Sequence, residues 1–113
     1  MTLWSRQHAW LSTRPKDFDK TRLQFLLMAK EEPEMPDVGS LEYLTEWLAE
    51  LDFCQSNGAI VRGVPHTEVK AWAENTGVKF HGQEAAWLVA MSRAYAAEVS
   101  RSDNKNADAP FEV

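Results

Sequence analysis

Residues 40–55, SLEYLTEWLAELDFCQ, carry the clearest helical pattern in the chain. Their leucines recur at the three- and four-residue spacing that places side chains on one face of an α-helix. These leucines are Leu41, Leu44, Leu48 and Leu51. Ser40 is a residue type that caps helix starts, and Glu42 suits the positive end of a helix dipole. We therefore expect a helix from Ser40 to about Gln55 that buries its leucine face.

Two further helices are predicted downstream of this one. The first begins near Pro65 and Thr67, and Asn75-Thr76-Gly77 ends it. The second runs from Gln83 to about Ser100, where alanines raise the helix propensity and an apolar stripe faces one side. The stripe contains Trp87, Leu88, Met91, Tyr95 and Val99. Residues 59–64 are the one place where a strand is conceivable, and none is required.

The chain upstream of residue 40 is less regular. A short helix is predicted from Thr2, as its cap, to Leu11, and the Arg14-Pro15 pair interrupts it. A second helix is predicted from a cap at Asp17 to about Lys30. Its cluster at residues 25–28, FLLM, is apolar enough to be buried on more than one side.

The predicted fold class is therefore all-α, a small bundle of four to five helices with a disordered C-terminal tail. We divide the chain into a basic N-terminal helical segment (1–30), an acidic Pro-containing linker (31–39), a helical core (40–100) and a disordered tail (101–113). The linker contains two prolines and a glycine among acids. The tail is polar and unpatterned, and its Phe111 and Val113 are candidate latches for a partner.

Charge is distributed unevenly along the chain, whose net charge is −5. Residues 1–22 carry five basic and two acidic side chains, whereas residues 31–53 carry eight acids and no Lys or Arg. This contrast is compatible with partner steering, with attraction between the two halves, or simply with a solvated helix face beside a basic arm. A net negative charge argues against nonspecific binding to nucleic acid.

Catalytic and metal-binding patterns find little support in the sequence. A single cysteine, Cys54, allows no intramolecular disulfide and no cysteine metal cage, and its helical position predicts a buried residue. His8, His66 and His81 are too scattered for a helical metal pair, although folding could bring the last two together. No phosphate-binding loop or nucleophile motif accompanies the serines or glycines. We expect a non-enzymatic protein without a cofactor.

A DNA-binding helix-turn-helix is the main reading from a different functional class. Residues 67–77 and 83–100 have its outline of helix, short turn and helix. A recognition helix, however, needs donors near its start, and here the first basic residue is Arg93. This weakens the DNA-binding interpretation.

An ordered series of blocks between about residues 40 and 95 resembles small tail assembly chaperones of long-tailed bacteriophages. The blocks are LTEWLAEL (44–51), VPHTEVKAWA (64–73) followed by Thr76-Gly77, and EAAW (84–87) leading to MSRAY (91–95). The proline-containing segment before Leu44 also fits. Two features depart from the family: His66 replaces an aromatic or hydroxyl residue, and the basic N-terminal segment has no clear counterpart.

The resemblance implies a non-enzymatic helical chaperone of tail assembly. Such a protein binds the tape measure protein, and in some cases tail tube subunits, in the host cytoplasm before the tube polymerises. A head–tail joining or tail completion protein is the nearest alternative. A homo-oligomer is compatible with the sequence. A secretory signal and a membrane span are not expected, because no segment approaches the roughly 20 apolar residues that a span needs.

Large side chains at helical spacing are the candidates for partner contact, although most such aromatics serve a core. Five tryptophans in 113 residues are many. Trp4 and Trp10, on the less regular segment, are the better candidates for exposed contacts. The full set is Trp4, Trp10, Leu44, Trp47, Leu51, Trp72, Trp87, Met91 and Tyr95.

Overall fold

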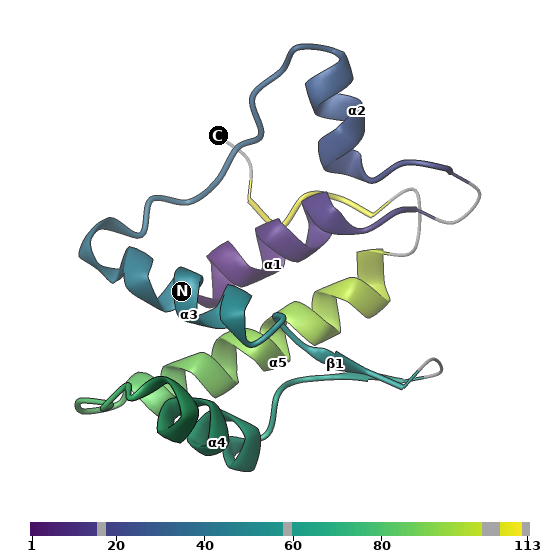
Figure 1. The fold of residues 1–113 in the computed structure, drawn as a ribbon. Coiled ribbons are helices and arrows are strands. Elements are labelled where there is room, and N and C mark those ends of the chain that lie inside the picture. Colours follow the sequence, from purple (N-terminus) through teal and green to yellow (C-terminus); the bar gives the residue numbers. More distant parts are fainter. Residues whose placement is uncertain (16–17, 58–59, 103–106, 112–113) are drawn as a thin grey trace.

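The computed structural model describes residues 1–15, 18–57, 60–102 and 107–111. Within these ranges the chain is mostly helical, as the sequence predicts, with the addition of a short antiparallel hairpin (Figure 1). The elements are α1 (Thr2–Ser12), α2 (Arg22–Met28), the 3₁₀ turn η1 (Gly39–Leu41), α3 (Glu42–Glu50), β1 (Gln55–Ser56), β2 (Val61–Arg62), α4 (His66–Thr76) and α5 (Glu84–Ser102).

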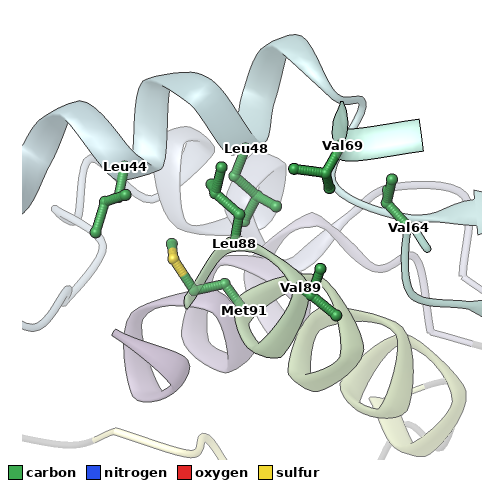
Figure 2. Packing of buried hydrophobic residues seen from close by; sticks show 7 residues of the cluster. All are labelled: Leu44, Leu48, Val64, Val69, Leu88, Val89 and Met91. Atoms are coloured by element: carbon green, nitrogen blue, oxygen red, sulfur yellow. The ribbon is translucent and has the colours of Figure 1, made fainter. Parts of the chain in front are cut away.

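Helix α5 lies at the centre of the fold. Helices α1, α3 and α4 and strand β2 all pack against it, and Figure 1 shows α1 and α5 side by side. The main hydrophobic cluster joins α3, α4 and α5 around Leu88, which has no exposed surface. Figure 2 shows its members: Leu44, Leu48, Val64, Val69, Leu88, Val89 and Met91. The leucine face predicted around Leu44 and Leu48 is thus confirmed as core.

The hairpin crosses α5 at a point where no side chain fits between the two backbones. Strand β1 pairs with β2 in the register Gln55↔Arg62 and Ser56↔Val61. A Cβ atom on the next residue, Gly63, would lie 2.9 Å from the backbone nitrogen of Arg93. The buried Ser92 hydroxyl accepts a hydrogen bond from the Val64 N–H (2.7 Å) and donates one to the Phe53 carbonyl (2.6 Å). Ser92 therefore fixes both ends of the hairpin to α5.

Helix α3 is shorter than predicted at both ends. Ser40 does not cap it, because Ser40 lies within η1 and Leu41 occupies the cap position without a side-chain hydrogen bond. The helix stops at Glu50 because Asp52 and Phe53 have left-handed backbone angles, with φ of 62° and 66°. Asp tolerates such an angle, whereas it is unfavourable for Phe. Packing of the Phe53 ring between His8 and Tyr95 offsets this cost.

The predicted helix boundaries elsewhere hold to different degrees. Asp17 lies outside the described residues, and the N-cap of α2 is Thr21, which forms a capping box with Gln24. Helix α1 begins at Thr2, so Met1 and not Thr2 occupies its cap position. Helix α4 ends as predicted at Gly77, whose φ of 75° is the left-handed geometry of a helix C-cap.

The C-terminal segment is not disordered where the structure describes it. Helix α5 continues to Ser102, and residues 107–111 lie beside α1 (yellow and purple in Figure 1). The Trp10 indole N–H donates to the Ala107 carbonyl (3.0 Å), and the Phe111 N–H donates to the side chain of Gln7 (3.0 Å). Composition could not predict this, because the contacts use the tail's backbone. Val113 lies outside the described residues.

Gly63→Ala should destabilise the protein by about 1–3 kcal/mol, because the added methyl must push the hairpin away from α5. Arg62→Ala in the same strand removes an exposed side chain and should stay within about 0.5 kcal/mol of the parent. Urea unfolding followed by circular dichroism gives both values. Equal stability of the two variants would contradict the close approach at residue 63.

Candidate protein-binding surface

Three of the predicted contact residues are buried in the fold. Leu44 and Met91 have no exposed surface, and Tyr95 is 7% exposed. Leu44 and Met91 belong to the main cluster. Tyr95 projects from α5 and contacts His8 of α1 and Phe53, which follows α3. In this conformation none of the three offers a surface to a partner.

Trp47, Trp72 and Leu51 are half-buried around the edge of the main cluster. The rings of Trp47 and Trp72 meet edge to face at 5.8 Å, and Phe80 contacts both of them. Tyr43 extends this group and donates a hydrogen bond from its hydroxyl to the Glu84 carboxylate (2.5 Å). These aromatics join α3, α4 and the start of α5, which is a structural role.

Trp4 belongs to a stack of four rings and is only half-buried. Trp4 stacks on His8 (5.0 Å between ring centroids), His8 on Phe53 (4.7 Å), and Phe53 on Tyr95 (4.8 Å). The His8 Nδ1 also lies 3.3 Å from the Tyr95 hydroxyl. Burial lowers the pKa of His8 below its usual value, because the charged imidazolium loses hydration.

Trp10 is held by contacts within the chain and not left open for a partner. Its indole N–H is bonded to the tail, and the Arg22 guanidinium lies 4.8 Å above its ring. Arg22 also donates to the Trp10 carbonyl (3.0 Å) and to the Ser102 carbonyl at the end of α5 (2.8 Å). One cation therefore joins α1, α2 and α5.

Trp87 is the predicted contact residue with the most open ring, at 40% exposure. It projects from α5 beside a small surface pocket of about 190 Å³. Met1, Leu41 and Ala90 also line this pocket. Trp87 thus remains a candidate for partner contact.

Several exposed apolar side chains lie on α2 or just before it, where the sequence predicted burial. Only Arg22 is buried in this helix. Leu27 is 58% exposed and Met28 is 66% exposed. Phe25 is 39% exposed and meets the ring of Phe18, itself 43% exposed, edge to face at 5.8 Å. We call Phe18, Phe25, Leu27 and Met28 the α2 surface.

Arg22 explains why the α2 surface faces outward. Its guanidinium holds the start of α2 on α1 and α5 through hydrogen bonds to the carbonyls of Trp10 and Ser102, and Leu23 and Leu26 on the same side are half-buried. The other apolar residues of the helix are left in contact with water. The apolar run at residues 25–28 does not by itself indicate an exposed surface, because the sequence does not show that Arg22 is the buried residue of this helix.

The ionisable groups that are buried serve the fold. Burial alone would raise the pKa of Glu98, but hydrogen bonds from Arg101 and Ser102 and the charges of Arg101 and Arg6 outweigh it and lower the pKa. Burial raises the pKa of the Cys54 thiol, which lies after α3 and not within a helix as predicted. Among the described residues, no three His, Cys, Asp or Glu side chains lie close enough together to hold a metal ion.

A second apolar cavity, of about 540 Å³, opens between α4 and the loop that leads into α5. Val69, Ala73 and Phe80 line it, and Lys70 and Lys79 lie at its sides. For the part of the chain that the structure describes, no helix has the length and hydropathy that crossing a bilayer requires.

Comparison of the chain with known protein families, curated proteins and solved structures found no match. The resemblance of residues 40–95 to tail assembly chaperones therefore stays a prediction.

The His8 stack predicts a dependence of stability on pH. Because the folded-state pKa of His8 is lowered from 6.5, its contribution to stability is complete above about pH 6.5 and is lost as the pH falls below that value. The free energy of unfolding of the parent should fall more between pH 8 and pH 5.5 than that of His8→Phe, which keeps an aromatic ring in the stack. Urea titrations at the two pH values measure this, and equal losses would contradict it.

Proposed function

We propose that the protein is a bacteriophage tail assembly chaperone that acts by binding and not by catalysis. Its partner is the tape measure protein, with tail tube subunits as a second partner. The observation that carries the proposal is the α2 surface, taken together with the block resemblance over residues 40–95. The other helices form a small support on which this surface is presented.

The energetic cost of the α2 surface supports a binding role. Each Å² of apolar area left in water forgoes about 25 cal/mol of burial energy. Contiguous exposed apolar residues commonly mark interaction sites in soluble proteins. Leu27 and Met28 are more than half exposed, and Met in particular adapts to irregular partner surfaces. A long helical tape measure protein offers apolar faces that such a surface would cover until the tube replaces it.

The position of α5 favours this role over DNA binding. In a helix-turn-helix the second helix must enter the major groove with one face free. Here that helix would be α5, and it carries the main core and packs against α1, α3, α4 and β2. Its exposed face near the start presents Ala86, Trp87 and Ala90, which are not base-reading side chains.

Co-expression with a tape measure protein from the same genome tests the proposal. We expect the two proteins to co-purify and the tape measure protein to become more soluble. Leu27→Ser combined with Met28→Ser should reduce the co-purified tape measure protein about tenfold or more, because two exposed apolar contacts are lost.

Ile60→Ser is the matched control, since Ile60 is 62% exposed but lies in the hairpin. It should leave co-purification unchanged. A tape measure protein that neither co-purifies with the parent nor gains solubility would refute the chaperone function. Equal losses in the α2 and hairpin variants would refute the α2 surface as the binding site. Recovery of the protein from purified virions would indicate a retained joining or completion protein instead.

A further inference from the structure

The C-terminal segment 107–111 occupies a groove between α1 and the linker residues 31–34. In the hydrogen bonds that the structure describes, only the backbone of residues 107–111 is bonded, and not their side chains. The Trp10 indole N–H donates to the Ala107 carbonyl, Arg101 donates to the Asp108 carbonyl (2.7 Å), and Gln7 accepts from the Phe111 N–H. Contacts of this kind select an extended backbone and place few demands on its side chains.

Gln7 is the central residue of the groove. The residue is 2% exposed, and its amide is bonded at both ends, because Nε2 donates to the Glu34 carbonyl (3.0 Å) while Oε1 accepts from the Phe111 N–H. The carbonyl end of this amide is therefore aimed at whichever extended segment lies beside α1. Helix α1 and the Glu34 carbonyl of the linker orient the Gln7 amide, so its orientation does not require residues 107–111 to be the bound segment.

The tail does not fill the groove. A cavity of about 340 Å³ remains beside Ala109 and Phe111. Leu26 contributes an apolar side to it, and Glu31 and Glu32 contribute exposed carboxylates. Residues 107–111 contribute only Ala109 and Phe111 to its lining, and none of these five residues is basic. The wall of the cavity thus suits a longer, positively charged side chain, which residues 107–111 do not supply.

We propose that this groove binds an extended, basic segment of a partner polypeptide, and that residues 107–111 are an internal occupant which the partner displaces. The partner segment places an apolar residue where Phe111 lies and a Lys or Arg where Ala109 lies. The cation meets Glu31 and Glu32. The site is separate from the α2 surface, although Leu26 of the same helix lines it, and it does not depend on the partner being a tape measure protein.

The test uses the full-length chain carrying Phe111→Ser, which weakens the hold of its own tail. The probes are two capped peptides, ADAPF, which copies residues 107–111, and ADRPF. The Trp10 indole N–H resonance in a ¹⁵N-labelled sample reports the groove, and Trp10→Phe assigns it. At low salt we expect ADRPF to shift this resonance and to bind about fivefold more tightly than ADAPF, as one favourable exposed ion pair allows.

A matched pair of variants identifies the source of that preference. Glu31→Gln combined with Glu32→Gln should abolish the advantage of ADRPF, whereas Glu46→Gln combined with Glu50→Gln removes two exposed acids of α3 and should preserve it. If neither peptide moves the Trp10 resonance in a folded chain, the groove is no peptide site. If ADAPF binds as tightly as ADRPF, the groove serves exchange of tails between copies of this chain, and the basic partner is refuted. Each outcome is independent of whether the tape measure protein co-purifies.

Discussion

The fold depends on covering helix α5, which no single neighbouring element can do. Its buried residues include Leu88, Met91 and Ala96, and they face several directions around the helix. Helices α3 and α4 cover one part and α1 another, so the N-terminal segment is as necessary to α5 as the patterned half of the chain. The hairpin covers the remaining part, and it reaches α5 only because Gly63 has no side chain to place against the Arg93 backbone. Helix α1 of the basic N-terminal segment is therefore packed against the same central helix as α3 and α4.

Arg22 determines what the fold leaves exposed. A guanidinium that loses water must be given hydrogen-bond acceptors, and the carbonyls of Trp10 and Ser102 supply them at the ends of two different segments. Ser102 ends α5, where the helix dipole also favours a cation. These contacts place Arg22, with the half-buried Leu23 and Leu26, on the inner side of α2, so Phe25, Leu27 and Met28 lie on its outer side. The exposure of the α2 surface is thus a consequence of how the helix is anchored, and no other contact is required to keep it exposed.

The sequence predicted the elements well where an apolar stripe is bounded by a clear turn residue: α4 ends at Gly77, and α5 follows the turn at Gly82. It failed where tertiary contacts override the local pattern. Helix α3 stops early because the Phe53 ring packs between His8 and Tyr95, and these three residues are far apart in the chain. The run at residues 25–28 has the composition of a core, and only the contacts of Arg22 show that it is not one. Of the predicted contact residues, Trp87 keeps an open ring, whereas Trp10 is taken up by the tail.

The tail contacts have the strength that a displaceable segment requires. Three backbone hydrogen bonds contribute about 0.5–1.5 kcal/mol each, and ordering five residues costs a comparable or larger amount of conformational entropy. The half-buried ring of Phe111 adds to these bonds, and few contacts have to break when another segment takes the place of residues 107–111. A partner segment that makes the same backbone contacts and adds one ion pair binds the groove more tightly than residues 107–111 do. This exchange requires no change in the core. Because Gln7 and Trp10 are held by α1, and α1 is held by α5, the groove keeps its shape while its occupant changes.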